Sequence, residues 1–71
     1  MNSFYFVASN SRPLVDQVEY LLNQPNEKFM VKLGNLFEFQ KAEFLYMCFT
    51  NGFVLDDKQS SIHTINLTLT K

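Results

Sequence analysis

Apolar and polar residues alternate along the C-terminal part of the chain. Between Thr64 and Thr70, an aliphatic residue occupies every second position and polar residues occupy the positions between. Successive side chains of a β-strand point to opposite faces of a sheet, so this period of two predicts a strand with one buried face. We expect that strand to span residues 62–70, after a polar loop.

Two segments have the spacing of amphipathic helices. In residues 12–24, apolar residues recur three and four positions apart, while polar residues, Gln17 among them, face away. Ser11 is expected to cap this helix, with Pro13 in its first turn. A second helix is expected over residues 41–51. Its inner stripe is expected to consist of Ala42, Leu45, Cys48 and Phe49.

The second helix has a clear stop signal. Gly52 follows Asn51 and precedes Phe53, and glycine readily adopts the left-handed conformation that ends many helices. We expect Gly52 in that conformation, with Phe53 packed back onto the helix. A short extended piece at Val54–Leu55 is expected to follow.

The pattern Phe-x-Phe occurs twice, at Phe4–Phe6 and at Phe37–Phe39. The first copy lies in residues 3–8, whose aromatic and β-branched content predicts a strand. Because alternate side chains share a face, both phenylalanines of this copy are expected to point into the core and Tyr5 to point outward. We expect the second copy to turn its phenylalanines inward as well.

Residues 28–40 fit two structures. In a hairpin with the loop Leu33–Asn35, Val31 pairs with Phe37 and Phe29 with Phe39, which makes one face wholly apolar. In the alternative, a long helix capped by Asn35 begins here, with a glutamate three residues later as in a capping box. The two-sided pattern favours the hairpin, whereas the helix would leave a β-α-β-α-β order.

With the hairpin, the element order is β-α-β-β-α-β. This order predicts a single α+β domain over residues 1–71 with a ferredoxin-like arrangement. The expected sheet is four-stranded and antiparallel, with both helices on one face and the other face open.

Charge and size narrow the classes of function. The chain has 71 residues and eight phenylalanines, which provide a core for a short domain. Six Lys and Arg residues against seven Asp and Glu residues give a net charge of −1, without a block of like charge. A duplex-DNA footprint needs several phosphate-facing cations. The closest approach to such a group is Lys28, Lys32 and Lys41.

The sequence contains no arrangement typical of catalysis. Cys48 falls on the expected inner stripe of a helix, where packing is the simpler interpretation. His63 has no cluster of ligating residues around it, and Asp56-Asp57 fits a solvated turn. We therefore expect no enzyme activity, no cofactor and no metal site. The single cysteine and the lack of a signal segment favour a cytoplasmic location.

The segment Lys32–Phe39 resembles the third-strand signature of RNA-recognition-motif domains. The helix that closes with Asn51-Gly52 and leads to Leu55-Asp56 also resembles the second half of that family, and Phe4–Val7 stands where its first-strand signature lies. The resemblance implies the β-α-β-β-α-β fold.

The family binds RNA with aromatic side chains on the open face of its first and third strands. In this chain only Tyr5 is aromatic at such a place, because Gly34 and Leu36 occupy the third-strand positions. The resemblance therefore implies the fold more strongly than RNA binding.

We expect a small non-enzymatic protein-binding module that regulates or inhibits by occluding a larger protein or complex, as phage or mobile-element inhibitors do. Apolar spots surrounded by polar residues on the open face suit a protein partner. The expected binding residues are Tyr5, Lys28, Met30, Lys32, Leu36 and Asn66. Homodimerisation through this face or an edge strand is another expectation. Single-stranded RNA binding by the same face is the alternative. No membrane association is expected.

Overall fold

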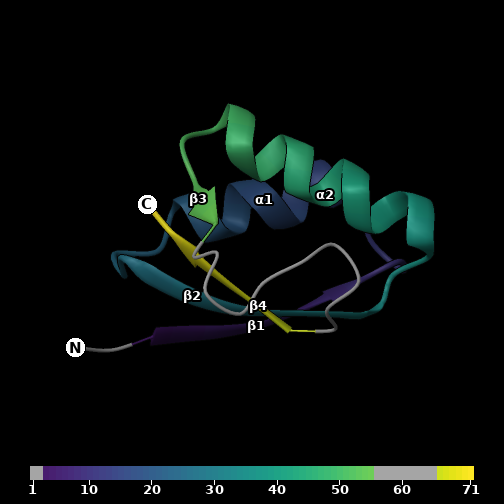
Figure 1. The fold of residues 1–71 in the computed structure, drawn as a ribbon, viewed down its shortest axis with the longest axis horizontal. Helices are drawn as coiled ribbons and strands as arrows, with labels where there is room; N and C mark the ends of the chain where they lie inside the picture. Colours follow the sequence, from purple (N-terminus) through teal and green to yellow (C-terminus); the bar gives the residue numbers. More distant parts are fainter. Residues whose placement is uncertain (1–2, 56–65) are drawn as a thin grey trace.

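The structure, a computed structural model, describes residues 3–55 and 66–71. In chain order these residues form β1 (Ser3–Ser9), α1 (Leu14–Leu22), β2 (Lys28–Asn35), α2 (Glu38–Thr50), β3 (Val54–Leu55) and β4 (Asn66–Thr70). The described strands form one four-stranded sheet in the order β1-β2-β4-β3. Both described helices cover the same face of this sheet (Figure 1). The domain is therefore α+β with one sheet face left open by the described elements, as predicted.

The sheet is mixed, and its connections differ from those expected. β1 and β2 are parallel neighbours joined through α1, whereas β4 runs antiparallel to both β2 and β3. The second helix, α2, joins β2 to β3, and β4 lies between those two strands. The fold thus consists of two β-α-β units that share β2, the second of them split by β4. The predicted ferredoxin-like order and antiparallel sheet are wrong.

The predicted hairpin fails because β2 already has a partner on each side. Phe29 pairs with Phe4 of β1 and with Leu69 of β4. No ladder position remains for residues 36–40, and they leave the sheet. Phe37 and Phe39 lie with their side chains 59% and 69% exposed, stacked on each other at 6.1 Å, rather than in the core.

The start of α2 is fixed by a glutamine. The Phe37 N–H donates to Oε1 of Gln40 at 3.0 Å, and the Phe37 carbonyl accepts from the backbone N–H groups of Gln40 and Lys41. The helical alternative for this segment was thus closer to the structure than the hairpin. Its expected cap, Asn35, is instead the last residue of β2.

Gln17 of α1 is buried, although the sequence pattern placed it on the outer face. Its side chain is 2% exposed. Its Oε1 accepts from the Ser9 N–H at 2.9 Å and its Nε2 donates to the Ser9 carbonyl at 2.7 Å. The amide thus bonds to both backbone groups of Ser9, as a neighbouring strand would. Ser11, the expected cap of α1, instead donates its N–H to the Ser9 hydroxyl, and the helix begins at Leu14.

The C-terminal end of α2 agrees with the prediction. Gly52 has a φ of 97°, its N–H donates to Phe49 O, and the Phe53 N–H donates to Cys48 O at 3.0 Å. This pair of bonds is the Schellman motif. Phe53 is buried, and Val54–Leu55 forms β3 as expected.

The core lies between the helices and the sheet. α2 buries Lys41, Phe44, Leu45 and Cys48, so the expected inner stripe is partly wrong, because Ala42 and Phe49 are exposed. Phe29 is at the centre, with its ring 5.9 Å from Phe4 and 5.3 Å from Phe53. Among the described residues, neither helix is long and apolar enough to cross a membrane.

The Gln17→Ala variant should be less stable by about 1–3 kcal/mol, since it leaves partly buried backbone groups of Ser9 without their Gln17 partner. Urea unfolding followed by circular dichroism measures this loss. Gln24→Ala is the matched control, because the Gln24 amide donates to Tyr20 O in an exposed position. It should change stability by less than about 0.5 kcal/mol. Equal losses in the two variants would contradict the bridging role of Gln17.

Candidate functional site

The face of the sheet opposite the helices carries the alternate side chains of its strands. We call this surface the open face. Its register places Tyr5 beside Met30 and Met30 beside Thr68, and it places Val7 beside Lys32. The described side chains of the open face are Ser3, Tyr5, Val7, Lys28, Met30, Lys32, Val54, Thr68 and Thr70.

A hollow of about 280 Å³ lies on this face between β1 and β2. Its walls include Tyr5, Val7, Met30 and Lys32. Tyr5 is 76% exposed, whereas Met30 is half-buried and its Sδ accepts from the Thr68 hydroxyl at 3.6 Å. The hollow therefore has a largely apolar lining, with an exposed aromatic ring at one side and an ammonium group at another.

Charge is unevenly distributed between the two layers. Lys28 and Lys32 are exposed on the open face, and they are its only charged side chains within the described residues. Among those residues, neither lysine forms an ion pair. The helices instead carry acidic residues, namely Asp16, Glu19, Glu38 and Glu43. The net charge of −1 thus conceals a basic open face and a more acidic helical layer.

Four of the predicted binding residues come together on the open face: Tyr5, Lys28, Met30 and Lys32. Leu36 does not join them, because it follows the end of β2 and its side chain is only 6% exposed in the core. The predicted position of Leu36 on the open face depended on the hairpin and is wrong. Asn66 aligns with Lys32 in the ladder, but its side chain lies outside the described residues.

Two features of this surface escaped the sequence pattern. Val54 is 62% exposed at the far edge of the sheet, in a strand of two residues that is too short to show a period. The hollow itself depends on the parallel pairing of β1 with β2, which no local pattern encodes. The alternation in β1 indicated the direction of Tyr5, and the alternation in β2 indicated that of Met30.

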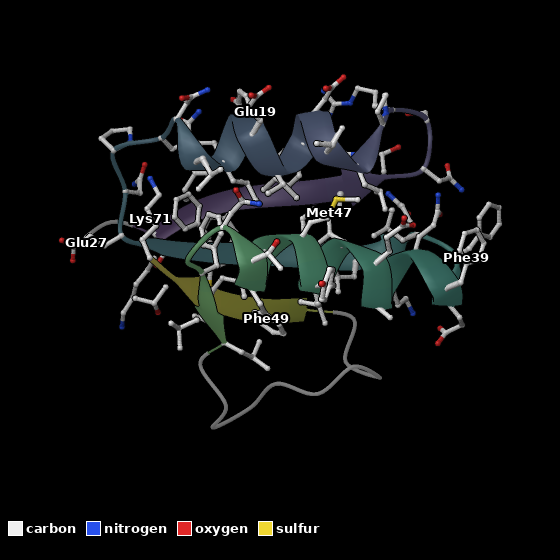
Figure 2. All side chains as sticks on the ribbon, turned by 90° about the horizontal axis from the view of Figure 1, so that it is seen from above. Glu19, Glu27, Phe39, Met47, Phe49 and Lys71 are labelled. Atoms are coloured by element: carbon white, nitrogen blue, oxygen red, sulfur yellow. The ribbon has the colours of Figure 1, made fainter. Side chains whose placement is uncertain are left out.

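The outer surface of α2 is a second exposed apolar region. Tyr46 and Phe49 are 69% and 45% exposed. Figure 2 shows Phe39 at the N-terminal end of the helix and Phe49 on the side away from α1, while Met47 points toward α1. This surface is convex, because it is the outer side of a helix. It therefore offers a partner less enclosure than the open face.

A wider groove of about 480 Å³ lies where α1 begins, next to α2. Its lining includes the exposed Arg12 and Glu43 and the half-buried Gln40. A cation and an anion on the same exposed rim favour no particular charge in a ligand. The open face, by contrast, combines an apolar hollow with charge of one sign.

Of the residues considered for catalysis in the sequence, only Cys48 lies in the part of the chain that the structure describes. Cys48 is fully buried on the core side of α2, and burial raises the pKa of its thiol from 9.0 to about 12. The neutral thiol is a poor nucleophile. His63, Asp56 and Asp57 lie outside the described residues. Within residues 3–55 and 66–71, no three His, Cys, Asp or Glu side chains are grouped to hold a metal ion.

Comparisons of the chain with protein-family models, with curated proteins and with solved structures give no match.

The Leu36→Ala and Tyr5→Ala variants test which of the predicted binding residues are structural. Leu36→Ala should lower the free energy of unfolding by about 2–5 kcal/mol, because it leaves a cavity in the core. Tyr5→Ala should lower it by less than about 1 kcal/mol, because the ring is mostly in solvent. Urea unfolding of both variants provides the comparison, and a larger loss for Tyr5→Ala would place Tyr5 in the core instead.

Cys48 should be protected from alkylation in the folded protein. At pH 8, iodoacetamide should react roughly a hundredfold more slowly than with the urea-unfolded chain, if unfolding costs about 3 kcal/mol. The folded thiol keeps a proton that the unfolded chain loses above pH 9. Its contribution to stability is therefore complete below pH 9 and is lost as the pH rises toward 12. Alkylation at equal rates in both states would show that the thiol is accessible.

Proposed function

We propose that this protein is a non-enzymatic protein-binding module whose open face covers part of a larger protein. The observation that supports this most is the apolar hollow beside Tyr5 and Met30, bordered by Lys32, which has no ion-pair partner among the described residues. Interfaces of this kind depend on a few anchoring side chains in well-packed pockets, with polar residues around them. Such a module would regulate or inhibit its partner by occluding part of the partner's surface, because covering a surface requires no reacting group.

The size of the hollow favours a side chain of a partner over a cofactor. At about 280 Å³, it lies just below the range of roughly 300–1,000 Å³ that is typical of small-molecule sites. An apolar side chain inserted there would contact Met30 and Val7 and cover the Tyr5 ring. The hollow is thus suited to receive one anchor residue from a protein surface.

The positive charge of the open face favours a partner with an acidic surface. Lys28 and Lys32 lie on the same strand, four residues apart, with Met30 between them. Carboxylates on either side of an apolar anchor would meet both ammonium groups. Such complementarity raises association rates and discriminates among partners. The proposed partner is therefore an acidic protein surface with one prominent apolar side chain, such as the target of a phage or mobile-element inhibitor.

Single-stranded RNA is the second candidate, favoured by the same lysines and the exposed Tyr5 ring. Stacking of a base on one aromatic side chain and contact with two cations would give weak, salt-sensitive binding. Tyr5 is the single aromatic residue on the described part of the open face. That arrangement provides less stacking surface than an array of aromatic residues.

The proposal is tested by comparing captured proteins between matched variants. Wild type, Tyr5→Ala, Lys32→Glu and Tyr46→Ala are immobilised, and proteins retained from a lysate of the source organism are quantified by mass spectrometry. The partner should be depleted on the Tyr5 and Lys32 variants and retained on Tyr46→Ala, which alters an exposed aromatic residue on the helical side. With the purified partner, each open-face change should weaken Kd by about tenfold or more.

Two outcomes would reject this function. Unchanged affinity in both open-face variants would remove the open face as the binding surface. Tighter binding to a single-stranded oligonucleotide than to any captured protein would favour the RNA candidate. In that case log K should fall with log salt concentration with a slope of about −1.4, as expected for two phosphate contacts on a single strand.

A further inference from the structure

β1 forms one edge of the sheet, and no strand among the described residues pairs with its outer side. The sheet order is β1-β2-β4-β3, and Figure 2 shows β1 as the outer strand beneath α1. Alternate backbone N–H and C=O groups along this strand of seven residues therefore face away from β2. An unpaired edge of this length is a template for another strand. The opposite edge, β3, has only two residues.

The sequence of β1 also has none of the residues that normally block edge pairing. Proteins protect edge strands with charged residues, proline or bulges. Ser3–Ser9 contains no charged residue and no proline. The register irregularity after Val7 adds a residue to β2, since β1 advances from Val7 to Ser9 while β2 advances from Lys32 to Asn35. β1 itself remains regular.

The apolar side chains at this edge are incompletely covered on both faces. Tyr5 is 76% exposed on the open face. On the helical side, Tyr20 of α1 is 51% exposed although its ring lies 6.0 Å from Phe4 and 5.8 Å from Phe6. Phe4 points into the core side yet stays half-buried. The aromatic cluster ends where the sheet ends, so an added strand would complete it.

The free part of the edge is symmetric about Tyr5. Both backbone groups of Ser9 are already bonded to the Gln17 amide, which leaves Ser3–Val7 available. We infer that this segment pairs antiparallel with the same segment of a second copy, about a two-fold axis at Tyr5. The result is an isologous dimer with one continuous sheet. This inference does not rest on the proposed function, because the open face stays accessible in the dimer.

The register about Tyr5 matches side chains of the same kind on the same face. Phe4 lies opposite Phe6 of the second copy, Tyr5 lies opposite its equivalent, and Ser3 lies opposite Val7. Aromatic pairs across strands are stabilising. The same axis brings the two Tyr20 rings toward each other above the phenylalanines. A second copy therefore supplies the complementary surface without any additional partner.

Electrostatics does not oppose this pairing. β1 has no charge of its own. The nearest lysines, Lys28 and Lys32, are on β2, so those of the two copies would be three strand spacings apart. That separation is about 14 Å, which exceeds the screening length of about 8 Å at physiological salt.

Two double variants at Ser3 and Val7 test the dimer and its register together. Both positions are exposed on the open face. Ser3→Glu with Val7→Glu places carboxylates opposite each other across the axis, although each lies beside a lysine of its own chain. Ser3→Lys with Val7→Glu places an ammonium group opposite a carboxylate. Sedimentation equilibrium gives the dimer Kd of each variant, and circular dichroism confirms folding.

Wild type should dimerise with a Kd below about 100 μM, and the double-glutamate variant should raise this Kd at least tenfold. The Lys/Glu variant should stay within about threefold of wild type. Monomeric wild type at 1 mM would overturn the inference, and so would equal dimerisation of the two double variants, since only the Tyr5-centred register opposes these positions.

A cysteine at the axis gives an independent readout. Opposite residues of an antiparallel pair lie about 4.5–5.5 Å apart at Cα, within the range that a disulfide spans. Tyr5→Cys should therefore form a covalent dimer at low micromolar protein with mild oxidant, while native Cys48 stays buried. Val54→Cys, exposed at the other edge, is the control. Equal cross-linking at both positions would indicate random collision and overturn the inference.

Discussion

β2 is paired on both sides, in parallel with β1 and in antiparallel with β4, and the other features of the domain follow from this double pairing. It encloses Phe29 and Val31 beneath the helices. Parallel neighbours cannot be joined by a tight turn, so α1 must cross over the sheet between β1 and β2. The same parallel pairing sets Tyr5 beside Met30 and thereby forms the hollow on the open face.

The C-terminal residue of this short chain is held against the central strand β2. The rings of Phe4 and Phe53 pack edge-on against the ring of Phe29. The Lys71 ammonium lies 5.2 Å from the centre of the Phe29 ring. The same ammonium donates to the carbonyl oxygens of Leu22, the last residue of α1, and of Gln24 just after it. One cation at the end of β4 thus contacts the central strand and satisfies carbonyl groups that the helix leaves free. At the end of β1, the Gln17 side chain likewise satisfies backbone groups, namely the N–H and the carbonyl of Ser9.

The period of apolar residues predicts secondary structure correctly where the structure of a segment depends on that segment alone. It identified the strand around Tyr5, the helix around Val18, the stop at Gly52 and the β4 strand from Asn66. It failed at residues 36–40, because an alternating pattern can belong to a hairpin or to the start of a helix whose aromatic residues stay in solvent. The partners of β2 decide between them, and they come from opposite ends of the chain. Leu36 was misplaced for this reason, and Gln17 was misplaced because its partner lies eight residues away in another element.

β1 faces the helices on one side, the open face on the other and solvent along its outer edge. Each of these environments favours different residue types. Toward the helices it needs phenylalanine and alanine, because Phe6 and Ala8 are in the core. Toward the open face, Tyr5 and Val7 line the hollow beside Lys32. A lysine or proline would protect the outer edge from pairing, yet Ser3–Ser9 contains neither. An edge of this kind either aggregates or pairs with a defined partner. A symmetric pair with its own copy satisfies the backbone groups of Ser3–Val7 once and leaves no free strand at that edge.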